Sequence, residues 1–427
     1  MAGQLLIFTS KLGYQARSFA DAARRLGAEV IFVTDRCHRL EDPWGDAAVP
    51  VNFVEPERAA ERVSAAMASS PPAARGLVAL GDAPLPAAAL AARSLGIRFH
   101  SPESVESCRT KLRQREVLRD AGLPVPDFLA FSMQDDAARL GQRIKYPCVV
   151  KPLALSASQG VIWAGNPMDF AAAVKRIRAL LASPEIAVTR DPALDQLLVE
   201  SYIEGEEIAV EALLTDGELR VLATFDKPDQ PAGPYFEETL YVTPSQHPAL
   251  ALVSVEATLR RAVSALGLTH GPLHCEFRLN ENGPWILEIH PRPIGGLCAR
   301  ALRFGPENIF LDELLVRHAL GIEGAGWPRE RAAGGVMMIP VPRSGTLDAV
   351  QGEEEARAVD GVSELAVTAR LHDRIAAWPE GSSYLGFIFA RGDSPERVAH
   401  ALRLAHSKLQ FAISPALAVE HPMARRA

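Results

Sequence analysis

The chain has 427 residues, of which 48% are hydrophobic and 23% are charged, and its formal net charge is −7. This length predicts about two to four domains, the negative charge gives no support to nucleic-acid binding, and no apolar run approaches the ~18 residues that a membrane span needs. Five cysteines without Cys-x-x-Cys spacing argue against zinc and disulfides and favour reduced thiols in a cytoplasmic protein.

Residues 1–100 alternate between strand and helix patterns. Short apolar runs at Gln4–Phe8, Glu29–Val33 and Gly76–Leu80 predict strands, and the stretches between them have helical spacing. This alternation predicts a doubly wound parallel sheet, and the first run is typical of a strand rather than a signal peptide. Asp82 follows the third strand, where such sheets bind ligands, although a helix cap explains it equally well.

The next segment combines a basic helix with a small-residue loop. Ser101 and a following proline begin a helix that we expect to continue to the glycine at position 122. Pro147–Pro152 is a buried-type strand that carries Lys151, and the loop 153–160 after it is rich in small and hydroxyl residues. Exposed amide and hydroxyl groups on such a loop suit phosphate oxygens, although an ordinary connecting loop is the simpler interpretation.

Three strands and a helix follow. Gln196–Ser201 and Glu206–Leu214 have strand patterns, and Leu219–Lys227 is expected to pair with the second of them through an Asp-Gly turn. The segment 228–239 is rich in proline and acidic residues and is expected to be a mobile loop. Residues 250–266 have helical spacing and end at a glycine.

The most informative stretch is a predicted hairpin around the turn Asn280–Gly283. Asn-Gly between two apolar runs is a strong hairpin signal. Folding the chain about residue 282 places Glu276 directly opposite Glu288. Like charges in that position destabilise a strand pair, and a divalent cation would resolve the conflict because Mg²⁺ and Mn²⁺ prefer carboxylate oxygens.

The alternation along both strands extends the polar face of this hairpin. The same face gains four ionisable side chains, namely His274, Arg278, His290 and Arg292. Trp285, Leu287 and Ile289 are expected to face a core. A solvated surface hairpin remains the simple alternative. The ionisable face leads into Pro-Arg-Pro-Ile-Gly-Gly, whose backbone can approach a ligand closely, and this favours a binding site.

The C-terminal third carries no chemical motif that we recognise. Residues 297–320 are expected to be helical and 324–335 to be a linker. The last unit contains strand patterns at Gly335–Pro340 and Ser383–Ala390 and a helical pattern from Pro395. We interpret it as a lid or packing subdomain, followed by a frayed tail at 418–427.

Four features in this order resemble the ATP-grasp superfamily over roughly residues 1–410. They are the helix with Lys111, the strand and loop after Lys151, the segment Glu200–Glu207, and the paired glutamates Glu276 and Glu288 followed by Arg292. The residues around His274 and His290 look most like the bacterial L-amino-acid ligases of the carboxylate-amine ligase branch, which make dipeptides.

The resemblance implies an α/β (α+β) ATP-grasp architecture. Its parts would be an N-terminal doubly wound parallel-sheet (Rossmann-like) domain at 1–100, a small lobe with the phosphate loop at 101–195, a large lobe with metal and catalytic residues at 196–325, and a C-terminal α+β lid subdomain at 335–417.

The resemblance also implies roles for individual residues. ATP would be bound by Lys111, Lys151, Ser156, Ser158, Gln159, Glu200, Ser201, Ile203 and Glu207. Mg²⁺, with Mn²⁺ as the alternative ion, would be held by Glu276, Glu288 and His290. Catalysis would use Arg292 and His274, and the substrate would contact Arg292, Gly295 and Gly296.

The chain departs from the family pattern at three points. His290 stands where the family usually has asparagine, the loop 153–160 is poor in glycine, and the Gln-Val-Glu signature of biotin carboxylases is absent, which disfavours bicarbonate chemistry. The expected function is ADP-forming ligation of a small-molecule carboxylate to an amine, most simply of two amino acids, and a homodimer is compatible with the resemblance. The alternatives are a ligase with another carboxylate or nucleophile, a non-catalytic nucleotide-binding protein, and a binding protein for a small acid that does not use ATP.

Overall fold

The computed structural model describes residues 3–10, 13–35, 47–68, 74–229 and 233–415. The predicted tail 418–427 and the central part of the predicted loop 228–239 lie outside these ranges. In the described part of the chain, no helix is long and apolar enough to cross a membrane.

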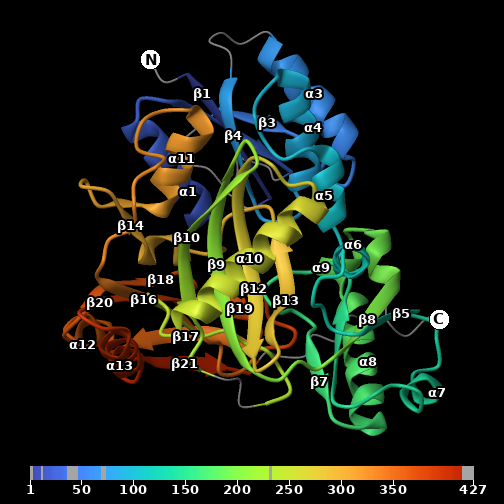
Figure 1. The fold of residues 1–427 in the computed structure, drawn as a ribbon. Coiled ribbons are helices and arrows are strands. Elements are labelled where there is room, and N and C mark those ends of the chain that lie inside the picture. The colour runs from blue at the N-terminus through green and yellow to red at the C-terminus, as the bar shows by residue number, and fades with distance from the viewer. Residues whose placement is uncertain (1–2, 11–12, 36–46, 69–73, 230–232, 416–427) are drawn as a thin grey trace.

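The N-terminal domain is a parallel sheet with helices on both faces (Figure 1). Its strand order is β3-β2-β1-β4. The strands are β1 (Gln4–Thr9), β2 (Glu29–Thr34), β3 (Ala48–Pro50) and β4 (Ala74–Leu80), and the helices are α1 (Tyr14–Arg25), α3 (Pro56–Ala68) and α4 (Leu85–Leu95). Alternate residues of β1 pack on opposite faces, so Leu5 joins the cluster with α1 and Leu6 joins the cluster with α3 and α4. The predicted doubly wound sheet is confirmed.

Two short helices, rather than the single one expected, lead to the next domain. α5 (Pro102–Cys108) ends two residues before α6 (Lys111–Asp120) begins. Thr110 caps α6, because its hydroxyl accepts a hydrogen bond from the Arg113 amide. The break places Lys111 on the first turn of α6.

The small lobe is an antiparallel sheet of order β5-β8-β6-β7 with α8 packed on one face. Its elements are β5 (Phe128–Ser132), α7 (Ala137–Gly141), β6 (Cys148–Pro152), β7 (Ile162–Ala164), α8 (Pro167–Leu181), α9 (Pro184–Ala187), a 3-10 turn at Pro192–Asp195, and β8 (Gln196–Ser201). The sequence assigned β8 to the large lobe, but β8 pairs with β5 and β6 and is therefore central to the small lobe.

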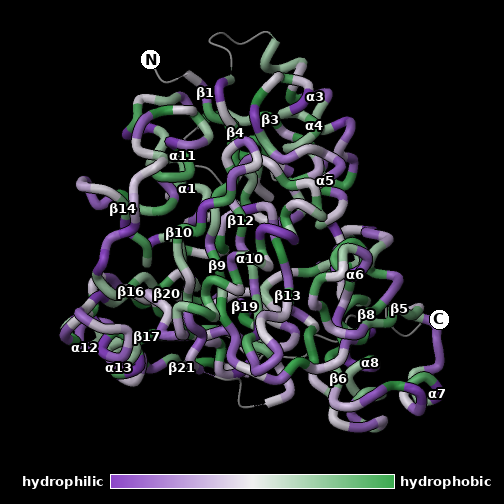
Figure 2. Tube along the Cα trace, viewed as in Figure 1, coloured by the Kyte–Doolittle hydropathy of each residue, from purple (hydrophilic) through white to green (hydrophobic). Residues whose placement is uncertain are grey.

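An eight-stranded sheet of order β13-β12-β9-β10-β11-β16-β20-β18 forms the body of the molecule. Its strands are β9 (Glu206–Thr215), β10 (Glu218–Asp226), β11 (Leu240–Thr243), β12 (Gly271–Asn280), β13 (Gly283–His290), β16 (Ala333–Ile339), β18 (Val362–Val367) and β20 (Gly386–Gly392). The long helix α10 (Ala249–Leu266) packs across it (Figure 1). Figure 2 shows hydrophobic residues along the central strands, in agreement with their burial.

The predicted large lobe and C-terminal subdomain share this sheet, because β11 pairs with β16. The rest of the C-terminal unit is a second sheet of order β19-β17-β21 and two helices. These elements are β17 (Gly345–Gln351), α12 (Glu353–Arg357), β19 (Arg374–Ile375), α13 (Pro395–His406) and β21 (Gln410–Ser414).

The segment 297–320 is helical only in part, which corrects the sequence-based expectation. It contains a 3-10 turn at Cys298–Ala301, a hairpin of β14 (Arg303–Phe304) and β15 (Ile309–Phe310), and then α11 (Leu311–Leu320). Gly305 and Asn308 have φ of 66° and 53°, and these left-handed residues turn the chain where a helix would have continued.

The central hairpin has the predicted register at its functional end. Glu276 pairs with Glu288, and His274 pairs with His290. A β-bulge follows Glu276, so Phe277 lies opposite Ile286. Ile286 therefore enters the core in place of the expected Trp285, which is only partly buried.

Candidate active site

A buried lysine that sequence reasoning missed lies beside Glu276. The Lys227 Nζ donates to Glu207 Oε1 at 2.7 Å and to Glu276 Oε1 at 3.3 Å, and it also contacts Glu238. Burial alone would lower the pKa of Lys227, but these carboxylates hold it well above its usual range. Burial raises the pKa of Glu238 to about 7, with Lys227 opposing the shift.

Glu288 is compensated by a different pair of cations. Its carboxylate lies 3.1 Å from Lys111 Nζ and 3.4 Å from His290 Nε2. Burial would raise the pKa of Glu288, yet Lys111 and His290 hold it well below its ordinary value. Burial would also raise the pKa of Glu276, but Lys227 and His274 lower it, so both opposed glutamates are carboxylates and each has its own ammonium group.

Asp82 connects the N-terminal domain to this face. Its carboxylate accepts two hydrogen bonds from Arg292, at 2.7 Å and 3.2 Å, and lies 3.0 Å from His290 Nδ1. Burial would raise the pKa of Asp82, but Arg292 and His290 hold it well below its usual range. The side chain does not cap α4, as the simpler interpretation supposed, and instead orients the guanidinium of Arg292.

His274 is held between two carboxylates. Its Nδ1 lies 2.5 Å from Glu211 Oε1, and its Nε2 lies 3.4 Å from Glu276. Burial opposes ionisation, but Glu211 raises the pKa of His274 to about 9. The second oxygen of Glu211 accepts a hydrogen bond from the Ile294 amide at 3.2 Å, which ties the histidine to the backbone before Gly295.

Gly295 and Gly296 differ in their surroundings. A Cβ on Gly295 would meet no atom within 4 Å, so that backbone is open to a ligand. Gly296 has φ of 62°, and a Cβ there would lie 2.7 Å from the Phe387 ring. Only glycine fits the second position.

Lys151 and Glu200 form a buried ion pair with Arg115. Lys151 Nζ lies 2.6 Å from Glu200 Oε2, and Arg115 Nε donates to Glu200 Oε1 at 2.7 Å. Burial lowers the pKa of Lys151, with Glu200 opposing the shift. Glu200, which is expected to contact ATP, is bonded to both of these cations in the structure.

The phosphate loop, residues 153–160, is tied to Lys111 at its first half. Lys111 donates from Nζ to the Leu155 carbonyl at 2.9 Å and from its amide to the Leu153 carbonyl at 3.2 Å. Ser156 is exposed and Ser158 is half-buried. Gln159 turns away toward the C-terminal unit, where its amide group donates to the Glu380 carbonyl at 2.7 Å.

Two backbone groups at the end of β8 and just after it are already hydrogen-bonded within the protein. The Ser201 amide donates to the Asp127 carbonyl at 2.8 Å. The Ile203 carbonyl accepts from Arg278 Nη1 at 2.8 Å, and Arg278 also donates to Glu207. Arg278 therefore links the segment between the lobes to Glu207, the expected ribose ligand.

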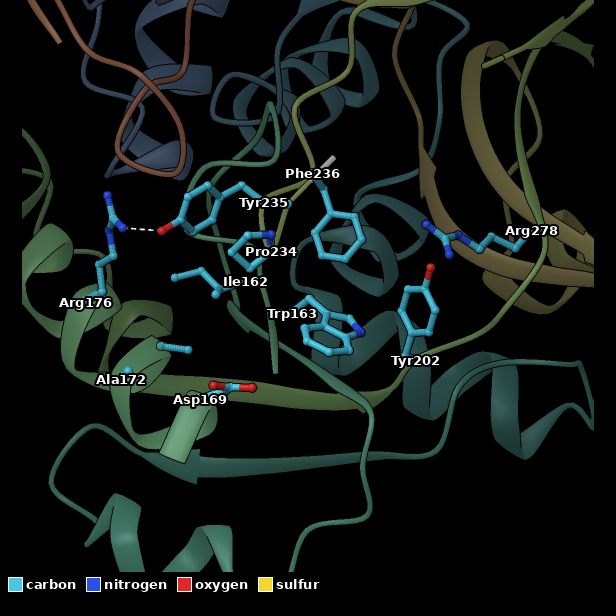
Figure 3. Close-up of a pocket in the computed structure, with 12 residues that line it drawn as sticks. Ile162, Trp163, Asp169, Ala172, Arg176, Tyr202, Pro234, Tyr235, Phe236 and Arg278 are labelled. Atoms are coloured by element: carbon cyan, nitrogen blue, oxygen red, sulfur yellow. Dashed lines mark hydrogen bonds between the residues drawn. The ribbon is translucent and has the colours of Figure 1, made fainter. Parts of the chain in front are cut away.

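A cavity of about 780 Å³ lies at this junction (Figure 3). Trp163, Tyr202 and Phe236 line it, with Arg176 toward one side and Arg278 toward the other. Val149 pairs with both Trp163 and Glu200, so Trp163 lies on the same sheet face as the Lys151–Glu200 pair. An aromatic cavity on the same sheet face as a buried lysine suits a ligand with a flat apolar end and an anionic end.

The carboxylate oxygens at this face suit a hard cation, although they come from a different group of residues than the predicted metal ligands. Among the described residues, the carboxylate oxygens that gather within 4.8 Å of one another belong to Glu207, Glu238 and Glu276, not to Glu276, Glu288 and His290. Oxygen donors of this kind suit Mg²⁺ or Mn²⁺. Both ring nitrogens of His290 already face carboxylates.

Three family models match the chain. The ATP-grasp N-terminal domain matches residues 20–97, the ATP-grasp domain matches 144–301, and the L-amino acid ligase C-terminal domain 2 matches 337–414. Together with the fold, these matches show that the chain belongs to the ATP-grasp superfamily. The predicted family and fold class are confirmed.

The similar proteins agree with this assignment. The crystal structure of an L-amino acid ligase from Bacillus licheniformis superimposes with a TM-score of 0.80 and 27% identity, covering 96% of this chain and 99% of that one. An ATP-grasp enzyme of Aspergillus fumigatus is 26% identical over 65% of this chain and 53% of its own length. An uncharacterized protein of Sinorhizobium fredii is 24% identical over 76% and 65%. The chain thus spans less than two thirds of these two curated relatives.

The residues missed by sequence reasoning differ in how visible they were. Glu211 is the acidic residue within the buried apolar run 208–214 of β9 and is 1% exposed, which is itself a signal of a buried functional or paired charge. Lys227 follows β10 directly and precedes an acidic loop, which is a weaker signal. The contact between Asp82 and Arg292 joins residues 210 positions apart and has no local signature.

Proposed function

We propose that this protein is an ATP-dependent ligase that activates a carboxylate as an acyl phosphate and joins it to an amine, most simply one amino acid to another, with release of ADP and phosphate. The observation that carries the proposal is the pair Glu276 and Glu288. They lie opposite on one hairpin face, both ionised, each beside an ammonium group and an imidazole. A sheet gains nothing from that arrangement, whereas phosphoryl transfer needs it.

ATP would lie between the two lobes. Its base would enter the aromatic cavity beside Tyr202 and bond to the Ser201 carbonyl and the Ile203 amide, since the Ser201 amide and the Ile203 carbonyl are already engaged, and its ribose would reach Glu207. Its phosphates would lie against Lys111 and Lys151, with Ser156, Ser158 and the backbone of Gln159 covering them, while the Gln159 side chain stays bonded to the Glu380 carbonyl. The short distance from Lys111 to Glu288 supports this placement, since an ammonium there can face a carboxylate and a phosphate together.

Mg²⁺ would be held by Glu276 and Glu288, with Glu207 and Glu238 within reach of the first. When bound, it would supply neutralisation of the charge on the transferring phosphoryl group. His290, with Asp82 on one nitrogen and Glu288 on the other, would orient Glu288 rather than take a coordination position.

The chemistry has two steps. A substrate carboxylate oxygen attacks the γ-phosphorus, the bond to the bridging oxygen of ADP breaks, and an acyl phosphate forms. The amine nitrogen of the second substrate then attacks the acyl carbon and loses a proton, and phosphate leaves with the bonding electron pair. Arg292, fixed by Asp82 and with its pKa raised by that carboxylate against the effect of burial, would stabilise the oxyanion between these events.

The amino-acid ends of the substrates would be recognised beside this guanidinium. The open backbone at Gly295 suits a substrate carboxylate, and His274, whose ring nitrogens face Glu211 and Glu276, would add positive charge beside it. The match of residues 337–414 to an L-amino acid ligase C-terminal domain supports amino acids as the substrate class.

The test is to incubate the purified protein with ATP, Mg²⁺ and amino acids, singly and in pairs, and to measure phosphate and products. Phosphate release that needs two amino acids, with a dipeptide detected by mass spectrometry, is the expected result. Release with one amino acid alone would indicate another nucleophile or hydrolysis. Tight ATP binding without turnover on any pair would contradict the substrate class, and no ATP binding would contradict the whole proposal.

A further inference from the structure

The C-terminal unit contacts the phosphate loop through three consecutive residues. The indole Nε1 of Trp378 donates to the Ala157 carbonyl at 2.9 Å, and the Pro379 carbonyl accepts from the Gly160 amide at 2.9 Å. The Glu380 carbonyl accepts from the Gln159 side chain. A segment more than two hundred positions downstream thus bonds to three residues of the loop, Ala157, Gln159 and Gly160.

The loop backbone needs an external restraint. Leu155, Ala157 and Ser158 have φ of 123°, 56° and 54°, in a region that non-glycine residues rarely adopt. Such strain persists only where the surroundings hold it in place. The carbonyl of Ala157 bonds to the 378–380 segment. Ser158 lies between Ala157 and Gln159, and the side chain of Gln159 bonds to the same segment.

A charged contact fastens the same segment to α8. Arg176 donates to the Glu380 carboxylate from Nε at 2.5 Å and from Nη2 at 2.8 Å, and it also bonds the Tyr235 hydroxyl (Figure 3). Tyr235 forms an isolated antiparallel bridge to Ile162 at the edge of β7. The small lobe is therefore held from the C-terminal unit through both its loop and its helix.

The segment has the character of a fixed support. Trp378 is 5% exposed and its ring lies 4.9 Å from that of Tyr384. Its indole N–H is therefore aimed by packing within the C-terminal core. The opposite side of the loop is bonded to Lys111. The restraint thus extends from the C-terminal unit through the loop to the lysine that pairs with Glu288.

From this geometry we propose that Trp378 and Glu380, with Arg176 as the partner of Glu380, are positioning residues that hold the phosphate loop over the phosphates of ATP. The consequence for catalysis rests on the proposed function, but the restraint on the loop does not. The device accounts for the scarcity of glycine in the loop, because a loop shaped by an outside support needs less intrinsic freedom.

The test is a charge-swap series at the Arg176–Glu380 pair in the full chain. The variants are Arg176→Glu, Glu380→Arg and the double variant. Lys175→Glu, at an exposed neighbouring position of α8, and Glu354→Arg, at an exposed position of α12, make matched charge changes as controls. Trp378→Phe removes the indole donor while keeping an aromatic ring, and it tests the proposal separately if a charge reversal disturbs folding.

Two readouts separate positioning from general stability. Hydrogen–deuterium exchange of the Gly160 amide, measured without substrates, should rise about tenfold in each single variant and return to near the wild-type rate in the double variant. With turnover, KM for ATP should rise about tenfold and kcat should change less, again with recovery in the double variant.

Unchanged Gly160 exchange in both single variants and in Trp378→Phe would overturn the proposal. So would single variants that leave KM for ATP unchanged, or a double variant that recovers neither readout. If the wild-type protein showed no ligase turnover, the proposed function would fail while the exchange data still decided the restraint.

Discussion

His270 and His274 lie four residues apart along the chain, yet their pKa values are shifted in opposite directions. His274, within β12, has its pKa raised to about 9 by Glu211 against the effect of burial. His270, just before β12, has its pKa lowered by burial and by Arg98. It stacks on His318 with ring centroids 4.5 Å apart, and burial lowers the pKa of His318 to about 4.

The difference shows what each region is built to hold. The face of β12 and β13 gathers carboxylates and gives each a cationic partner, so charge is kept in a partly buried place. Around His270 and His318, Asp216 opposes the lowering of both pKa values, but the effect of burial is larger and keeps these histidines neutral. Paired buried charge is therefore typical of the proposed reaction site, and neutral buried histidine is typical of a packing interface.

Removing the negative charge of Glu200, on β8, should lower the free energy of unfolding more than the other substitutions below. Glu200→Gln leaves Arg115 and Lys151 buried without their anion, and we expect a loss of about 3–5 kcal/mol in unfolding free energy. Urea denaturation measures this. Glu55→Gln, in an exposed pair with Arg58, should cost less than about 1 kcal/mol, and an equal loss in the two variants would contradict the contrast.

Glu276→Gln should remove activity without removing the fold. Lys227 keeps Glu207 and Glu238 as partners, so the thermal midpoint should change little. We expect a fall in kcat of about a hundred- to thousandfold, because an amide cannot hold the cation or balance the developing charge. Glu281→Gln, at the exposed turn of the same hairpin, should be neutral. Substantial activity in Glu276→Gln would show that the paired charges are structural.

Substitutions at Gly295 and Gly296 test the effect of packing space without changing any charge. Gly296→Ala should lose about 1–3 kcal/mol of unfolding free energy, since its Cβ would meet the Phe387 ring and its φ of 62° is unfavourable. Gly295→Ala should leave stability within about 0.5 kcal/mol and raise KM for the amino-acid substrate. Denaturation and steady-state kinetics on both variants check this. A stable Gly296→Ala protein would be inconsistent with the close packing.

Lowering the pH from neutral toward 5 should reduce the free energy of unfolding, because the buried neutral His318 disfavours the folded state in acid. A histidine whose folded pKa is about 4 contributes stability that is fully present above the unfolded value of about 6.5 and is lost as pH falls toward 4. Between pH 7 and pH 5 the loss from His318 should be about 1–2 kcal/mol. Urea denaturation at both pH values should show a smaller pH effect in His318→Gln, which can still bond Thr215. An unchanged pH effect would mean that His318 is not neutral in the folded protein.

Much of the fold and part of the site could be read from local sequence. The turn Asn280–Gly283 and strand alternation were sufficient to place Glu276 opposite Glu288. The alternating strands and helices predicted the N-terminal sheet. These features depend on neighbours along the chain, which a single sequence displays directly.

The incorrect and missed predictions arise from features of the folded chain that the local sequence pattern does not show. One extra residue in the bulge put Ile286 rather than Trp285 into the core, and left-handed residues at Gly305 and Asn308 interrupted an apparent helix. The sequence also gave no sign that the loop at Gln159 is held by Glu380, 221 positions away. Such contacts depend on how domains pack, and no local pattern encodes them.

The most direct measurement follows the oxygen that an acyl phosphate must transfer. The protein would be supplied with ATP, Mg²⁺ and a productive amino-acid pair in which the activated carboxylate carries ¹⁸O, and the released phosphate would be analysed by mass spectrometry. Attack of the carboxylate on the γ-phosphorus predicts one labelled oxygen in each phosphate, with the other retained in the new amide. Phosphate without label would contradict activation of a carboxylate by this protein.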